Sequence, residues 1–282
     1  MFVKPTLLQA LGTTDAQIND ASKKIATGKK INSALDDPIT FNRITTTKAS
    51  VSETGIKLNT LEYGIDRLDA RDSVLSSMQD TVMRFQELAT MASTGIHKLT
   101  DILPEMRSLK ESMISLANTS DASGLMFAGT AINITPFVKD PVTGAVSYAG
   151  STAEHMVEVE GVRLNGSING APFIAVFDAM DNVINSMAAS TAPNATMVSD
   201  VRASLETLIT ARTNAAAQAA GANMIKAALT SRSDRESGEV SKMEDADITK
   251  ETIKLTEGQK HYEAILKITG MELNRRRLMD FL

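Results

Sequence analysis

Apolar residues recur at heptad spacing along most of this chain, and this spacing constrains the fold more than any other feature. Ile44, Val51, Leu58 and Ile65 follow one another at intervals of seven, within a segment that runs from about residue 39 to 92. A stripe of this kind is buried only when the helix packs against another helix. We therefore predict one long helix in this segment, longer than the helices of compact domains and paired with a second helix.

Shorter stripes of the same kind occur at the two ends of the chain. The N-terminal stripe precedes Gly28, a residue suited to the position just after a helix. The C-terminal stripe begins at about residue 248. Neither stripe is apolar enough to support an isolated helix, so we predict that the two pack together. The candidate assembly interface comprises Leu11, Ile18, Ile25, Ile248, Leu255, Tyr262, Leu266 and Leu273.

Between the helical segments, residues 131–172 show no helical stripe. Gly, Pro, Asn and Ser recur there, and residues 156–164 alternate apolar and charged side chains, which predicts a small β insertion. Helical spacing resumes near 173, and a second helix after the long one is expected from about 103. The predicted fold class is mainly α: an elongated rod of long antiparallel helices with paired N- and C-terminal coiled-coil segments. The β insertion is expected at the tip, with a small core of its own.

This pattern divides the chain into three parts. Residues 1–40 with 245–282 form the terminal helical assembly segments, and residues 41–130 with 173–244 form a helical rod domain. Residues 131–172 form the small β domain. Residues 231–247 are polar and of mixed charge, which fits either an exposed helix or a hinge.

The charge and cysteine content exclude several classes of function. Lys and Arg number 29 against 34 Asp and Glu, so the chain has no basic footprint for nucleic acid or an anionic membrane. Its tightest basic cluster, 275–277, falls near the end of a predicted helix, where cations are favourable. Cysteine is absent, which removes thiolate catalysis and Cys-ligated metal. No apolar run is long enough for a membrane span or a cleaved signal peptide.

No residue pattern points to an enzyme or to a cofactor. His97, His155 and His261 are far apart and have no metal-ligand spacing, so we predict no metal site, no cofactor and no catalytic residues. The acidic pair Asp36 and Asp37 has no third ligand or base nearby. We expect it to cap the following helix and to pair with Lys29 or Lys30, the basic residues just before it.

Several ordered blocks of the sequence resemble one protein family. The segment 24–38 reads KIATGKKINSALDDP, 118–130 reads NTSDASGLMFAGT, 244–247 reads EDAD, and 278–282 reads LMDFL. These blocks are similar to those of the bacterial flagellin superfamily. Proline after the Asp-Asp pair and the C-terminal LMDFL resemble, within it, the hook-associated protein 3 family.

This resemblance implies a structural subunit of the flagellum at the junction between hook and filament. It implies export in an unfolded state through the flagellum's own apparatus, without a cleaved signal peptide, to an extracellular site. The implied partners are a hook-associated protein 1-type adaptor, flagellin, further copies of the chain in a ring, and an export chaperone. The terminal helices would fold against one another and against neighbours on assembly.

Two other functions stay open at this point. A short filament flagellin would share most of the blocks and differ at Asp37, Pro38 and the C-terminus. An exported adhesive or carbohydrate-binding protein would need exposed aromatic side chains in the β insertion, where Phe137 and Tyr148 are the aromatic residues available.

Overall fold

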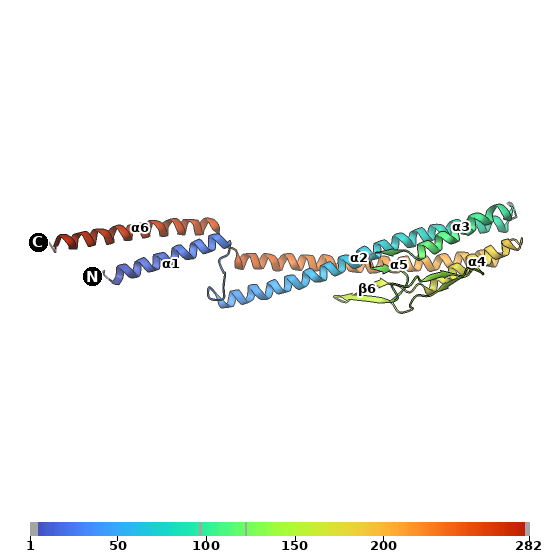
Figure 1. The fold of residues 1–282 in the computed structure, drawn as a ribbon, viewed down its shortest axis with the longest axis horizontal. Helices are drawn as coiled ribbons and strands as arrows, with labels where there is room; N and C mark the ends of the chain where they lie inside the picture. Colours follow the sequence, from blue (N-terminus) through green and yellow to red (C-terminus); the bar gives the residue numbers. More distant parts are fainter. Residues whose placement is uncertain (1–4, 96–97, 122, 280–282) are drawn as a thin grey trace. The chain divides into compact units, whose positions relative to one another are not determined.

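The computed structural model describes residues 5–95, 98–121 and 123–279, and side chains within 7–95, 98–121 and 123–271. The chain is mainly helical (Figure 1). It divides into two compact units, Met1–Gly55 with Ser231–Leu282, and Ile56–Thr230. The three-part division inferred from the sequence remains a proposal about how its segments fold.

Long helices account for most of the described residues, as the heptad spacing predicted. The helices are α1 (Pro5–Thr27), α2 (Pro38–Ser93), α3 (Leu99–Ala117), α4 (Ile174–Ala188), α5 (Ala195–Glu244) and α6 (Ile248–Met279), and the short 3-10 helix η1 (Ala171–Phe173) precedes α4. The prediction of a long helix from 39 to 92 is confirmed by α2. Residues 231–244 are helical, as the end of α5, and the chain leaves the helix only at 245–247.

The start of the third helix differs from the prediction. It was expected near residue 103, but α3 begins at Leu99 and contains Pro104 within it. Lys98, in extended geometry, directly precedes the helix. The helix therefore tolerates Pro104 in its second turn, where the proline removes one backbone donor.

Three two-stranded antiparallel hairpins make up the β structure. They pair β1 (Ser120–Asp121) with β2 (Gly124–Leu125), β3 (Phe137–Lys139) with β4 (Val146–Tyr148), and β5 (His155–Val159) with β6 (Val162–Ser167). Glu160 and Gly161 connect the last pair with φ of 48° and 80°. Positive φ at both central positions is the geometry that matches the twist of a two-residue hairpin, and glycine adopts it without strain.

One hydrophobic core combines residues of α2 to α5 with residues of the second hairpin. Phe137 of β3 is almost completely buried, and its ring lies 5.3 Å from that of Phe177 on α4 and 5.5 Å from that of Tyr148 on β4. Val146 of β4 belongs to the same cluster as Phe85 of α2. The second hairpin is therefore packed on the helices rather than on a core of its own.

A second core lies between the β5–β6 hairpin and the middle of α2 and α5. Leu61 and Leu68 of α2, Ala222 of α5 and Leu164 of β6 are buried together. Gly64 of α2 faces the same leucine: a Cβ added there would lie 2.5 Å from Leu164 Cδ1. The expectation of a β tip with a separate core is thus wrong. The hairpins lie alongside the helices and supply part of their cores (Figure 1).

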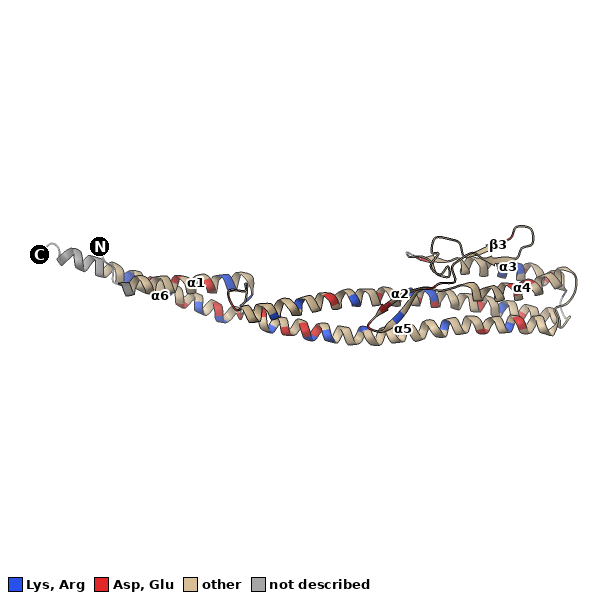
Figure 2. Ribbon diagram, turned by 90° about the horizontal axis from the view of Figure 1, so that it is seen from below, with Lys and Arg blue, Asp and Glu red and all other residues tan. Residues whose placement is uncertain are grey.

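Charged residues of both signs occur on all the α-helices except α4, whose charged residues are Asp178 and Asp181. Figure 2 shows Lys and Arg interspersed with Asp and Glu along the long helices. No helix in the described part of the chain is long and apolar enough to cross a membrane.

Replacing Leu61 with Ala tests the second core. Its side chain is fully buried, so the substitution should lower the free energy of unfolding by about 2–5 kcal/mol. Met224→Ala, at a side chain of α5 that is 73% exposed, is the control and should change stability little. Urea unfolding followed by circular dichroism measures both. Equal effects of the two variants would contradict the assignment of the core.

Candidate assembly interface

The connectors that join the helices of the terminal unit meet at the residue block 28–32. Lys30 N donates a hydrogen bond to Glu244 O at 2.7 Å, and Ala246 N donates to Gly28 O at 2.9 Å. Gly28 has a φ of +70°, which disfavours residues with a side chain. Two chain segments that are more than 200 positions apart are therefore fastened to each other by backbone hydrogen bonds.

Glu244, the last residue of α5, is the buried charge at this crossing. Its carboxylate lies 2.7 Å from Lys29 Nζ and 2.5 Å from Lys48 Nζ, and only a tenth of its side chain is exposed. Burial acts to raise the pKa of Glu244, but the hydrogen bonds and charges of Lys29 and Lys48 outweigh it and lower the pKa. A buried carboxylate with two cationic partners therefore holds together α2, α5 and the connector between α1 and α2, residues 28–37.

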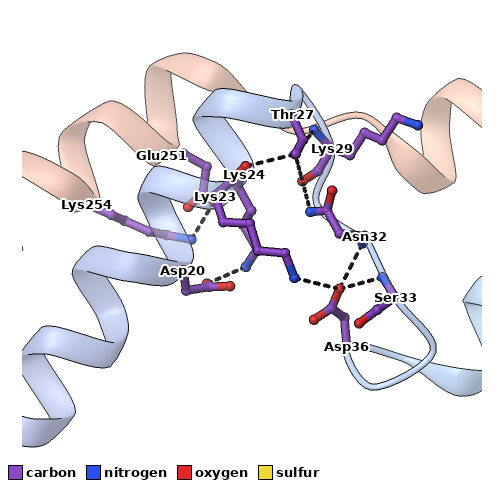
Figure 3. A network of polar contacts seen from close by, with 10 residues as sticks. All are labelled: Asp20, Lys23, Lys24, Thr27, Lys29, Asn32, Ser33, Asp36, Glu251 and Lys254. Carbon is purple, nitrogen blue, oxygen red and sulfur yellow. Dashed lines mark hydrogen bonds and ion pairs between the residues drawn. The ribbon is translucent and has the colours of Figure 1, made fainter.

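Asp36, the first residue of the acidic pair, fixes the loop that leads up to it (Figure 3). Asp36 Oδ2 accepts hydrogen bonds from the backbone N–H of Asn32 at 2.8 Å and of Ser33 at 2.9 Å, and these bonds lower its pKa. Its nearest cation is Lys23, at 3.9 Å. The expected pairing with Lys29 or Lys30 is wrong, because Lys29 binds Glu244 and Lys30 Nζ donates to a backbone carbonyl, that of Lys242.

Asp37 caps α2, as predicted. Its Oδ1 accepts from the N–H groups of Ile39 at 3.0 Å and Thr40 at 3.1 Å, and its Oδ2 accepts from Thr40 Oγ1 at 2.5 Å. The Thr40 hydroxyl and these N–H groups lower the pKa of Asp37. Pro38 occupies the first position of the helix, where its missing N–H has no cost.

Helices α1 and α6 pack against each other, in agreement with the predicted pairing of the two ends. Leu11, Ile18 and Ile25 are partly buried on α1, and Leu255 and Tyr262 are partly buried on α6. A Cβ on Gly258 would lie 2.9 Å from Ile18 Cγ1, which shows how closely the two helices approach.

Two of the predicted residues are exposed, and the side chain of a third is not described. Ile248 is 44% exposed and Leu266 is 48% exposed, so neither is buried in the contact with α1. The side chain of Leu273 lies outside the described residues. That the predicted residues contact neighbouring subunits remains a proposal.

The seam on α6 has a different set of residues from the one predicted. Gly258 and Glu251 are buried and Ile265 is partly buried. Together with Leu255 and Tyr262 they are spaced alternately four and three residues apart. The spacing was therefore visible in the sequence, but a glycine and a glutamate at seam positions do not look like a hydrophobic stripe.

Glu251 brings a second buried carboxylate into this seam. Its Oε1 accepts a hydrogen bond from Lys254 Nζ at 2.7 Å, and its Oε2 has no hydrogen-bond partner among the described residues. On the facing helix, Lys24 Nζ donates to Asp20 Oδ2 at 2.6 Å (Figure 3). The α1–α6 pair is thus closely packed and has charged groups in its seam, rather than a continuous apolar core.

The remaining polar candidates form no catalytic or metal site in the part that is described. No group of three or more His, Asp and Glu side chains with metal-binding geometry occurs there. His155 and His261 are exposed, and His97 and the side chains of 275–277 lie outside the described residues.

Comparison with known proteins gives the class of this fold. Residues 3–131 match the family described as the bacterial flagellin N-terminal helical region. Flagellin of Listeria monocytogenes is 36% identical over 80 residues, which are 28% of this chain and 27% of that protein. Over its N-terminal part the chain is therefore similar to the helical region of flagellins.

The particular proteins that the chain resembles are hook-associated proteins. Flagellar hook-associated protein 3 of Escherichia coli is 22% identical over 137 residues, 47% of this chain and 43% of that protein. The chain thus matches less than half the length of these curated relatives. Two crystal structures share the fold. That of Bacillus cereus FlgL has a TM-score of 0.59 and 15% sequence identity, and the match covers 68% of this chain and 99% of that one. That of Legionella pneumophila hook-associated protein 3 has a TM-score of 0.62 and 11% identity, and the match covers 71% of this chain and 98% of that one.

A pH titration tests the ion pairs of Glu244. Because its folded pKa lies below the ordinary value of 4.5, the stabilisation is complete above that value and is lost as pH falls through the folded pKa. Amide exchange at Lys30 and Ala246, corrected for intrinsic rates, should speed up over this window. In Glu244→Gln these two amides should exchange faster already at pH 7, and their exchange should depend less on pH. Glu239→Gln, at a half-exposed side chain, is the control, and the same profile in both variants would refute the role of Glu244.

Enlarging Gly258 tests the close approach of α1 and α6. Gly258→Leu should force the helices apart and speed amide exchange near Ile18 and Leu255, because even a Cβ already lies too close to Ile18. Gly270→Leu on the same helix is the matched control, since a Cβ there meets no atom within 4 Å. Leucine favours a helix more than glycine does, so the control should not loosen α6. Unchanged exchange in Gly258→Leu would mean that the two helices do not pack in this register.

Proposed function

We propose that this chain is a non-enzymatic structural subunit of the bacterial flagellum that forms the junction between hook and filament. The observation that carries the proposal is the α1–α6 pair, in which the two ends of the chain pack together and still leave apolar side chains in water. Ile253, Ile268 and Met271 of α6 are all more than half exposed. Apolar groups gathered on one helix in this way are typical of a surface that becomes buried in an assembly.

The position of these side chains supports a contact with other chains. At 100° per residue, Ile253 and Met271 lie on the side of α6 turned away from Gly258, the residue that touches α1. Leu266 is also exposed, on a flank of the seam. Helix α6 therefore has one side for α1 and other sides for neighbouring subunits. The candidate residues Ile248 and Leu266 share one flank of the seam, between the side that meets α1 and the side that carries Ile253 and Met271.

Similarity to hook-associated protein 3 favours the junction over other positions in the flagellum. On this proposal the partners are a hook-associated protein 1-type adaptor on one side, flagellin on the other, and further copies of the chain in a ring. Export proceeds through the flagellar apparatus with the help of a chaperone, and the assembled subunit is extracellular. No part of the function requires a cofactor, nucleic acid or a membrane.

A filament flagellin is the main alternative, and the flagellin match over the N-terminal part supports it. An adhesive function receives no support from the β hairpins. Phe137 is buried, and Tyr148 is partly buried with its hydroxyl donating to the carbonyls of Phe127 and Ser151. In the part described, neither ring is available as a platform for a sugar.

Immunogold labelling of intact flagella separates the junction from the filament. A single band of label at the distal end of the hook is the expected result. Label along the whole filament would show instead that the chain is a flagellin, and its abundance in sheared flagella would agree.

Leu266→Asp tests the exposed flank of α6 that carries Ile248 and Leu266. Since Leu266 is half exposed in the single subunit, the aspartate should leave the helical content and solubility unchanged. In an assembly it would place an unpaired carboxylate in an apolar contact, which costs several kcal/mol. Cells should export the variant, retain hooks, release flagellin into the medium and lose motility. Ser199→Asp, which adds the same charge at an exposed polar residue of α5 away from the terminal helices, should swim. Full-length filaments in Leu266→Asp cells would refute an assembly role for this surface.

A further inference from the structure

The seam between α2 and α5 loses its apolar residues over one stretch, every residue of which the structure describes. Between Ile44 and Leu61 of α2, Thr54 is the one buried residue. Between Leu229 and Val240 of α5, no residue is buried. Little apolar surface therefore holds the two helices together in this stretch, although the seam has buried apolar residues on either side of it.

The heptad of α2 explains its half of the gap. Positions seven residues apart hold Thr47, Thr54, Leu61 and Leu68, so the stripe changes from threonine to leucine along the helix. Threonine buries less apolar surface than leucine, and its branched side chain favours a helix less. On α5 the segment 231–239 consists of polar residues, charged residues and one glycine.

Polar groups rather than apolar side chains connect the two helices across the gap. Arg232 Nη2 donates a hydrogen bond to Ser50 Oγ at 3.0 Å, and Arg43 lies 3.7 Å from the carboxylate of Glu239. A solvent-open hollow of about 530 Å³ lies beside these contacts and is lined by polar and charged residues of both helices. Exposed pairs of this kind contribute little to stability because water competes for the same groups.

Each helix also has a glycine in this stretch that packing does not require. A Cβ added to Gly55 of α2 or to Gly238 of α5 would meet no atom within 4 Å. Glycine inside a helix lowers its stability relative to alanine, because glycine loses more backbone freedom when it becomes helical. Both helices are therefore weakened where their seam is weakest.

We propose that residues 45–57 of α2 and 230–239 of α5 form a hinge, at which the helix pair opens locally and bends while the seam on either side stays closed. Sparse apolar burial, exposed polar contacts and an unneeded glycine on each helix coincide in these segments, and each lowers the cost of local opening. In the proposed junction function, the hinge lets one subunit adapt the curvature of its helices to different neighbours. That use rests on the proposed function, whereas the hinge itself does not.

Amide hydrogen exchange of the full-length chain, resolved by NMR, tests the local opening. After correction for intrinsic rates, amides in 47–55 and 231–239 should exchange faster than those in 61–75 and those in 244–246, on either side of the hinge. Exchange that rises steadily from 61–75 toward the ends of the two helices would mean fraying, and would overturn the proposal. Equally slow exchange throughout would overturn it too.

Alanine at the two glycines tests the cause of the opening. Gly55→Ala and Gly238→Ala should each slow exchange in their own hinge segment by about two- to fivefold, the factor expected for this change inside a helix. Gly221→Ala is the matched control in α5, since its Cβ would make one ordinary contact, with Val162 Cγ1 at 4.0 Å. It should leave exchange in 231–239 unchanged. Equal slowing by all three variants, or none by Gly55→Ala and Gly238→Ala, would refute the hinge.

Distances between spin labels test the bending, and the absence of cysteine lets labels be placed at chosen positions. Met224→Cys with Lys242→Cys spans the hinge segment of α5, and Arg202→Cys with Ala220→Cys is the control pair before it. All four side chains are exposed, and the members of each pair are 18 positions apart, about 27 Å along a straight helix. The hinge pair should give the broader distance distribution, and Gly238→Ala should narrow it. Equal widths for the two pairs would overturn the proposal.

Discussion

The apolar stripes of this chain are narrow, and this limits how any of its helices can be stabilised. In α2 the fully buried residues Leu61, Leu68 and Leu75 recur at intervals of seven, while only two of the twelve residues between them, Ile65 and Arg71, are buried. A helix with such a stripe gains little from burial by itself, and it becomes stable when a second helix covers the stripe. The pairing of α1 with α6 and of α2 with α5, and the packing of the hairpins on the helices, all follow from this limit.

Where the helices of the terminal unit are connected, polar interactions take over from apolar packing. The block 28–37 contains few apolar side chains, and its residues act mainly on the backbone. Gly28 allows a positive φ, Asp36 binds two N–H groups of its own loop, and Asp37 caps α2. Glu244 at the end of α5 adds ion pairs with two lysines, Lys29 of this block and Lys48 of α2. In the sequence this block looks like a candidate acidic site. In the structure its residues set the path of the backbone between α1 and α2.

Several parts of the structure were predictable because they depend on local sequence. The length of α2 follows from its heptads, the cap of α2 from Asp37 and Pro38, and the two hairpins within 131–172 from alternation and turn residues. The β1–β2 hairpin lies outside the predicted β insertion. Of the residues predicted for the seam of α6, Leu255 and Tyr262 are partly buried, whereas Ile248 and Leu266 are exposed. Glu251 and Gly258 are polar or lack a side chain, so an argument from apolar periodicity passes over them. Gly258 is buried because α1 approaches it closely, and that approach is a property of two helices together.

The burial of Arg67 could not be predicted either, because nothing in its sequence neighbourhood distinguishes it from the exposed charges beside it on α2. By itself the sequence determined which segments are helical, where the chain turns, and that both ends carry stripes in need of partners. Those features depend on residues close together in the chain. Only the tertiary structure decided which face of α6 meets α1, that the hairpins pack on the middle of α2 and α5, and that the side chain of Arg67 is buried. Each of these depends on side chains brought together from distant segments, whose packing and desolvation energies no local pattern contains.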